Sequence, residues 1–112
     1  MKLVAAIVRP LKLDEVREAL LAVGVEALTV TEVRGFGRQT GYIELYRDAE
    51  YEVELLPKIK IEIAARSEMV APVIEAIEKS AATAKIGDAK IFGFGLDQVI
   101  RIRTGESGEA AL

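Results

Sequence analysis

The 112-residue chain contains no cysteine, no histidine and no tryptophan. Without cysteine it can form neither disulfide bonds nor thiolate metal sites. Without histidine it lacks the usual general base, a residue for phosphohistidine chemistry, and the ligand that most zinc and copper sites use. These absences exclude the commonest metal sites and several classes of enzyme.

The chain also lacks long uncharged apolar runs. Each such run is well short of the roughly 18 residues that a membrane span needs. The apolar start is short and is closed by Arg9 and Pro10, which argues against a signal peptide. The net charge of −3 gives no overall attraction to nucleic acid or acidic membranes. Since 51% of the residues are apolar, we expect one globular domain over residues 1–112, soluble and cytoplasmic.

Apolar patterning predicts two strand–helix–strand repeats. Residues 2–8 are a nearly all-apolar run, typical of a strand buried on both faces. Residues 58–63 alternate strictly between charged and apolar side chains, as in a strand with one apolar face. The remaining elements are a helix from Leu13 to Val23 ended by Gly24, a strand over 25–35, a helix with Ser67 as N-cap, strands over 90–94 and 99–103, and a polar tail over 104–112.

This order is the ferredoxin-like split βαβ arrangement of an α+β fold, β-α-β-β-α-β, with a long loop between the second and third strands and an extra C-terminal strand. The helices would cover one face of the sheet. Lys58, Lys60 and Glu62 would lie on the other face. A mixed face of this kind is either partly solvated or packed against symmetry mates, and we predict an oligomer.

The connection between the second and third strands is much longer than an antiparallel pair needs. It spans residues 37–55, whereas hairpin loops take roughly 2–5 residues. It contains Arg38 and Arg47 and all the tyrosines, which are Tyr42, Tyr46 and Tyr51. We predict that this loop carries function by contacting a partner.

A possible anion site lies near the end of the chain. In a strand over 99–103, Arg101 and Arg103 would share one face about 7 Å apart, a spacing that suits a di- or triphosphate. From this pair alone, a solvated edge strand protected by its charges is the simpler interpretation. The turn over residues 85–90 leads into the strand predicted over 90–94. It favours a phosphate site, because Gly87 permits close approach of the backbone to an anion and Lys90 adds a third cation.

Several short segments of the chain match a known family in register. They are Lys12–Val16, Leu28–Val33, Gly35–Gln39, Glu44–Arg47, Ala49–Tyr51, Leu56–Lys58, Lys85–Asp88, Lys90–Phe92 and Val99–Glu106. On these segments the chain closely resembles the PII nitrogen-regulatory signal proteins over nearly its whole length.

The resemblance implies a homotrimer with three clefts between subunits, which bind ATP or ADP in competition. By position, the residues that would line the adenine and ribose region are Thr29, Gly37 and Ala64. Those that would hold the phosphates are Gly87, Asp88, Ala89, Lys90, Arg101 and Arg103, with Arg38 reaching across the cleft. The implied activity is regulatory binding rather than catalysis, with at most slow ATP hydrolysis.

The resemblance also implies a second ligand, 2-oxoglutarate, bound through the Mg²⁺ of bound ATP together with Gln39 and Lys58. No other metal contact from the protein is implied. The ligand would select among conformations of the long loop, which is allostery by population shift. Tyr51 would be modified in lineages that have a uridylyltransferase. The implied partners are an ammonium transporter or another membrane transporter, and enzymes or kinases of nitrogen metabolism, with no nucleic acid.

The chain departs from the family pattern at several positions. Asp48, Ala84 and Ala89 replace usual glycines, and Ala64, Gly93, Thr40 and Tyr42 also differ. If residue 84 or 89 adopts positive φ, each alanine costs about 1 kcal/mol. With this penalty and an added methyl group facing the phosphates, nucleotide affinity would fall by up to roughly tenfold per site. Asp48 adds a charge near Tyr51, which would weaken recognition by a uridylyltransferase.

Two other functions of this topology are disfavoured by the sequence. A ferredoxin-like nucleoside diphosphate kinase would need a histidine, and an RNA-binding module would need aromatic residues on its central strands. A divergent PII-like trimer with weakened nucleotide binding, which regulates a different transporter or binds a different effector, stays open.

Overall fold

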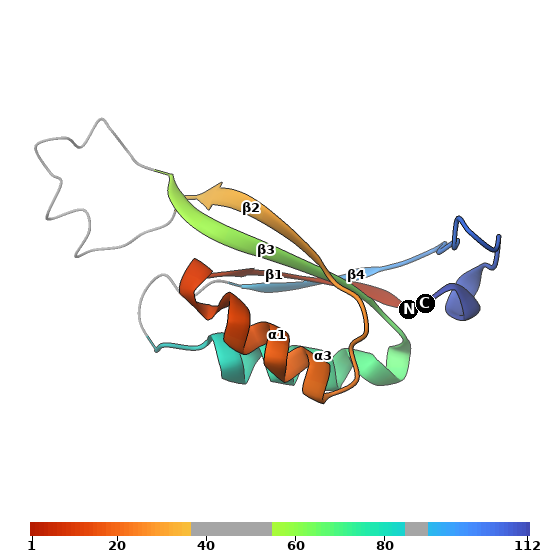
Figure 1. Cartoon of the computed structure of the whole chain (residues 1–112), viewed down its shortest axis with the longest axis horizontal. Helices are drawn as coiled ribbons and strands as arrows, with labels where there is room; N and C mark the ends of the chain where they lie inside the picture. The colour runs from red at the N-terminus through yellow and green to blue at the C-terminus, as the bar shows by residue number, and fades with distance from the viewer. Residues whose placement is uncertain (37–54, 85–89) are drawn as a thin grey trace, which may run out of the picture.

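The computed structural model describes residues 1–36, 55–84 and 90–112. The elements follow in the order β1 (Lys2–Val8), the 3-10 helix η1 (Pro10–Lys12), α1 (Leu13–Ala22), β2 (Thr29–Gly35), β3 (Leu56–Ala65), α3 (Ser67–Ala81), β4 (Ile91–Gly95) and the 3-10 helix η3 (Gly108–Ala111). Figure 1 shows both α-helices on one side of the sheet, and the C-terminal segment extending beyond the far end of β4.

The four strands form one antiparallel sheet in the order β2-β3-β1-β4. The central strands β1 and β3 pair along their length, with Ala6 opposite Ile61. β4 adds to the outer edge of β1, and β2 adds to the outer edge of β3. The predicted α+β fold, with two strand–helix–strand repeats, is confirmed for the described residues.

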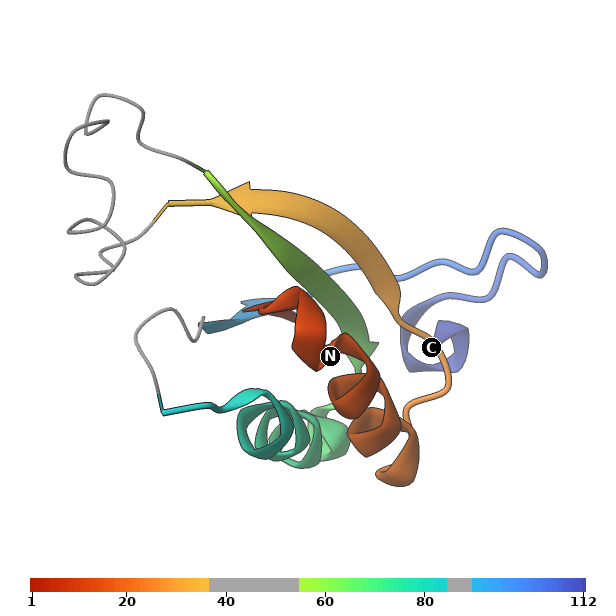
Figure 2. The same ribbon diagram turned by 60° about the vertical axis from the view of Figure 1, so that its left-hand side comes forward.

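The core lies between the sheet and the two helices. It consists of the helix-facing side chains of β1 and β3 and the buried stripes of the helices, namely Val4, Ala6, Val8, Ile59, Ile61, Ile63, Val16, Leu20, Val73 and Ile77. The alternation predicted for residues 58–63 is confirmed, because the three isoleucines are buried and the intervening residues are only half-buried. Figure 2 shows that α1 and α3 pack side by side beneath the strands.

The boundaries of α1 agree with the sequence to within one residue, whereas the predicted cap of α3 does not. α1 ends at Ala22, and Gly24 follows it at φ +99°, a conformation that glycine adopts without strain. The prediction that Ser67 caps α3 is wrong, since Ser67 is the first helical residue and Arg66 occupies the N-cap position. The Ser67 Oγ instead accepts a hydrogen bond from the Met1 amino group at 3.2 Å.

The extra C-terminal strand predicted over residues 99–103 does not form. Ile100 makes only an isolated antiparallel bridge to Ser107, and residues 102–104 form a turn. Gly105 at φ +74° reverses the chain. The prediction rested on the alternation of isoleucine and arginine, which is typical of a strand with one buried face. Ile100 and Ile102 are instead exposed (62% and 98%) and face no apolar layer among the described residues.

Among the described residues, no helix is long and apolar enough to cross a membrane.

Candidate functional site

The sheet face opposite the helices is open and largely apolar. The cross-strand register places Phe92 beside Ala5 and Phe94 beside Leu3 on this face. The two phenylalanine side chains remain about half exposed, at 45% and 52%. A depression of about 630 Å³ spans the face and is bordered by Val33, Lys60 and Glu62 on the other two strands. Within the described residues, no element of the chain covers these aromatic rings.

Two of the predicted nucleotide-binding residues lie near one another on the same face. Thr29 opens β2 and pairs with Glu62 of β3, and Ala64 follows Glu62 by two residues. Since side chains two apart along a strand share a face, Thr29 and Ala64 are diagonal neighbours, about 7–8 Å apart between backbones. Both residues are exposed.

A cavity of about 720 Å³ brings Ala64 together with Arg101. Its walls are the connection from α1 to β2 (residues 23–27), the end of β3, the start of α3, and the final residues Ala111 and Leu112. This volume lies within the range of roughly 300–1,000 Å³ that is common for small-molecule sites. Arg66 and Glu68 also contribute to the walls.

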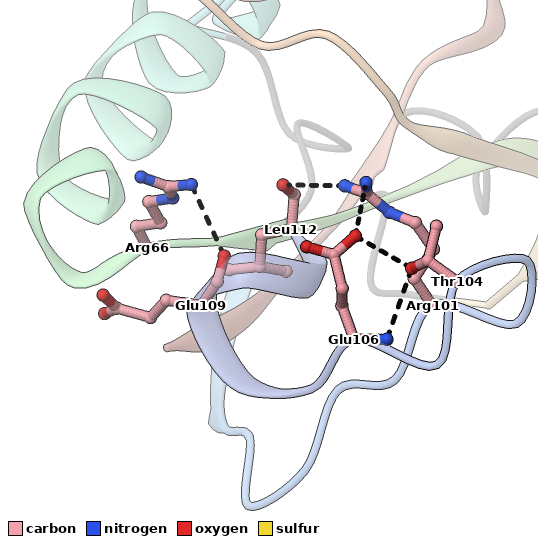
Figure 3. Close-up of polar contacts among 6 residues, drawn as sticks. All are labelled: Arg66, Arg101, Thr104, Glu106, Glu109 and Leu112. Atoms are coloured by element: carbon pink, nitrogen blue, oxygen red, sulfur yellow. Dashed lines mark hydrogen bonds and ion pairs between the residues drawn. The ribbon is translucent and has the colours of Figure 1, made fainter.

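Arg101 is held by its own C-terminal segment (Figure 3). Its Nη1 lies 3.4 Å from the Glu106 Oε1, and its Nη2 donates to the Leu112 carbonyl oxygen at 3.4 Å. The same Glu106 Oε1 accepts from the Thr104 hydroxyl at 2.8 Å, and the Glu106 amide donates to the Thr104 Oγ1 at 3.2 Å. Backbone hydrogen bonds between Arg101 and Glu106 and between Gly105 and Arg101 close the turn.

The C-terminal segment is also attached to the body of the protein. Arg66, at the start of α3, donates from Nη2 to the Glu109 carbonyl oxygen at 3.4 Å. The Gly108 amide donates to the Val99 carbonyl oxygen at 2.9 Å. Arg103 lies at the tip of the turn and is exposed.

Within a single chain, Lys90 lies away from Arg101 and Arg103. It precedes β4, lines a separate cavity of about 130 Å³ with Arg9 and Ile77, and accepts a backbone hydrogen bond from Ile7. The five residue steps from Lys90 to Gly95 span roughly 17 Å of extended chain. Arg101 follows beyond that end of β4. The three predicted cations are therefore brought together only in part, and Lys90 stands at the opposite end of its strand.

The other predicted site residues divide between described and undescribed parts of the chain. Lys58 is half-buried on β3 opposite Val33, with its side chain against Gly35. The remaining ones lie outside the described residues, and they are Gly37, Arg38, Gln39, Tyr51, Gly87, Asp88 and Ala89, together with almost all of the loop 37–55.

Ala84 adopts φ +60°, the left-handed conformation considered for it from the sequence. An L-residue with a Cβ costs about 1 kcal/mol or more there, whereas glycine costs little. The strained residue immediately precedes the segment 85–89, where several phosphate-binding residues are predicted.

Two contributors were not predicted from the residues themselves. Glu106 and Arg66 organise the C-terminal segment around Arg101. The sequence signal for Glu106 is its position directly after Thr104-Gly105. A turn at this glycine reverses the chain and brings the Glu106 carboxylate back to Arg101. Arg66 has no comparable signal, because its partner is a backbone carbonyl 43 residues away.

Comparison with known proteins gives a consistent result. The model of the family "Nitrogen regulatory protein P-II" matches residues 1–106. The chain is 59% identical to Nitrogen regulatory protein P-II of Rhizobium etli and 58% identical to Nitrogen regulatory protein GlnK of Escherichia coli K12, in each case over the full length of both chains. It is 57% identical to Nitrogen regulatory protein P-II of Cereibacter sphaeroides, also over both full lengths. The chain belongs to the P-II family of nitrogen regulatory proteins.

Proposed function

We propose that the chain is a P-II signal protein that binds ATP or ADP in clefts between the subunits of a cytoplasmic homotrimer. The observation that carries the proposal is the cavity where Ala64 meets Arg101, with Lys90 at the far end of β4. The described residues thus supply two partial cationic sites rather than one complete site.

A second copy of the chain would complete the site. Three cations that are to hold one triphosphate must converge within a few ångströms, because each guanidinium grips neighbouring non-bridging oxygens. In one chain, Lys90 and Arg101 line different cavities. The open sheet face lies between these two ends and carries exposed Phe92 and Phe94. Burying that face against other copies would bring the Lys90 end of one subunit near the Arg101 end of another.

The described residues fit a nucleotide chemically. Arg101 and Arg103 provide guanidinium donors for phosphate oxygens, and Lys90 provides a compact ammonium charge. Thr29 offers a hydroxyl and Ala64 a small apolar surface on the same sheet face, which suits a ribose and a flat base. The described residues contain no cluster of acidic groups that would hold a metal ion, so Mg²⁺ would arrive with the phosphates.

Regulation would follow from a second ligand and the long loop. Gln39 and Lys58 would bind 2-oxoglutarate when Mg²⁺ and ATP are present, and the loop 37–55 would change its conformation in response. The partners proposed for the loop are an ammonium transporter and enzymes or kinases of nitrogen metabolism. This role is regulatory and needs no catalytic residue, which agrees with a chain that has no histidine or cysteine.

The double substitution Arg101→Ala with Arg103→Ala tests the nucleotide site. We expect calorimetry to show loss of ATP binding, while sedimentation shows an unchanged assembly. The matched control is Arg17→Ala with Lys79→Ala, which removes the same charge from two exposed helix residues that form local ion pairs. Unchanged ATP affinity in the arginine variant would overturn the site assignment.

The substitution Gln39→Ala tests the second ligand separately. We expect ATP binding to persist and the response to 2-oxoglutarate to disappear. A normal 2-oxoglutarate response in this variant would show that the second ligand uses other residues.

One observation favours the alternative of a PII-like interaction trimer with weakened nucleotide binding. Ala84 is strained at φ +60° next to the predicted phosphate turn. If that strain disturbs the turn, nucleotide affinity falls, and Ala84→Gly should restore it. An ATP dissociation constant that is the same for both proteins would remove the support for this alternative.

A further inference from the structure

The contacts of Arg101 suggest a role for the C-terminal segment, residues 106–112. The arginine proposed to bind phosphate already has two anionic or polar partners in its own chain, the Glu106 carboxylate and the Leu112 carbonyl oxygen (Figure 3). Both lie 3.4 Å away, so neither contact is tight. Arg101 and Glu106 are also partly exposed, with 38% and 45% of their side chains accessible. The pair is therefore open to competition.

The Glu106 carboxylate occupies the kind of position that a phosphate oxygen would take on the guanidinium. Thr104 and the turn hydrogen bonds hold that carboxylate in place, so it presents a fixed negative charge to Arg101. A guanidinium has five N–H donors in one plane and can exchange a single carboxylate oxygen for two phosphate oxygens. A polyphosphate would gain more from Arg101 than Glu106 does, whereas a weakly charged anion would not.

The final residues share the cavity with this arginine. Ala111 and Leu112 line the same 720 Å³ cavity as Ala64 and Arg101. A ligand that draws Arg101 towards its phosphates also removes the donor that Leu112 uses. The segment is also attached by the bond from Arg66 to the Glu109 carbonyl oxygen, at 3.4 Å, and by the bond from the Gly108 amide to the Val99 carbonyl oxygen, at 2.9 Å.

We propose that Glu106 is an internal competitor for Arg101, which sets the affinity of the phosphate site and couples its occupation to release of residues 108–112. The inference rests on the proposed nucleotide binding. Its two consequences are that removing the Glu106 charge tightens polyphosphate binding, and that polyphosphate binding loosens the C-terminal segment. A partly exposed ion pair of this kind accounts for a change of about two- to fivefold in affinity.

The test compares Glu106→Gln with a matched control, Glu109→Gln. Both remove one negative charge from the same segment, but the Glu109 carboxylate points away from Arg101 (Figure 3). Glutamine at 106 keeps an oxygen that can accept the Thr104 hydrogen bond, so the turn is retained. Calorimetric titration with Mg²⁺ and ATP should give about two- to fivefold tighter binding for Glu106→Gln than for wild type, and no change for Glu109→Gln.

Hydrogen exchange provides the second readout. Saturating ATP should speed exchange of the Gly108 and Leu112 amides in the wild-type protein. Equal affinity in the two variants, or tail amides that stay equally protected with ATP, overturns the inference while leaving nucleotide binding intact. If no protein binds ATP, the proposed function fails and the inference fails with it. ATP binding by Glu106→Gln alone would support competition strongly.

Discussion

At the scale of single residues, Ala84 is the clearest departure from an unstrained chain. Its φ of +60° places a Cβ where it crowds the following carbonyl oxygen. Ala84→Gly should raise the free energy of unfolding by about 0.5–1 kcal/mol, after allowing for the greater freedom of glycine in the unfolded chain. Denaturant unfolding measures this difference.

Ala82 provides the control for that substitution. It has φ −69° and ψ 133°, an extended conformation that alanine adopts without strain, and it is exposed. Ala82→Gly should therefore destabilise the protein, by roughly 0.4–1 kcal/mol. If both glycine variants change stability in the same direction, the positive φ at residue 84 is not what determines the result.

The candidate site could be predicted from the sequence only in part. Thr29 and Arg101 lie in segments that resemble a known family, Ala64 was assigned by its position in that family, and the structure places Ala64 and Arg101 at one cavity. A strand after Lys90 was predicted, but the cavities that Lys90 and Arg101 line were not, because the predicted strand over 99–103 is replaced by a turn beyond the end of β4. The sequence shows which residues are charged. It does not show whether those charges converge within one subunit or only between two subunits.

At the scale of elements, β3 shows how alternation positions a core. Ile61 is fully buried against the helices, while Lys60 beside it lies on the open face and remains 39% exposed. Ile61→Ala should destabilise the protein by about 2–5 kcal/mol, because it removes buried methyl groups and leaves a cavity. Lys60→Ala should change stability by roughly 0.5 kcal/mol or less. Comparable losses in urea unfolding would contradict the assignment of the two faces.

Helix α3 carries an exposed ion pair with a measurable electrostatic signature. The Lys79 ammonium donates to Glu75 at 2.6 Å, and this hydrogen bond with its attraction lowers the pKa of the Glu75 carboxyl. A lowered pKa means that the pair stabilises the helix above the ordinary glutamate pKa, and that this contribution is lost as pH falls through the folded value. NMR titration should show the Glu75 pKa returning towards its ordinary value in Lys79→Gln. An unchanged value would mean that the pair does not form in solution.

The elements differ in how far the sequence predicts them. Strand β3 and helix α1 follow from apolar periodicity, because each has one partner layer that its pattern must match, whereas β1 follows from its nearly unbroken apolar run. The segment 99–103 has the same alternation but no layer to face, so it forms a turn around Gly105 instead. Serine is a common N-cap residue, yet the Ser67 hydroxyl oxygen accepts a hydrogen bond from the Met1 amino group and does not cap α3. In both cases, tertiary surroundings decide between structures that the local pattern permits.

At the scale of the whole molecule, the open sheet face predicts assembly. Phe94 is half exposed there, beside Phe92 and Leu3. A charge on this face would oppose its burial against other copies, so Phe94→Asp should convert a trimer to monomers in sedimentation experiments. Leu11→Asp is the control, since Leu11 is 94% exposed in η1, away from the open face. A wild-type protein that sediments as a monomer would contradict the predicted assembly.

Nucleotide binding by the assembled protein is the central property proposed for this chain. The measurement that tests it most directly is calorimetric titration of ATP into the wild-type chain with Mg²⁺, with and without 2-oxoglutarate. We predict saturable binding of one ATP per chain, and binding of 2-oxoglutarate only after ATP and Mg²⁺ are present. No detectable ATP binding, at protein concentrations where the assembly is intact, would contradict the account.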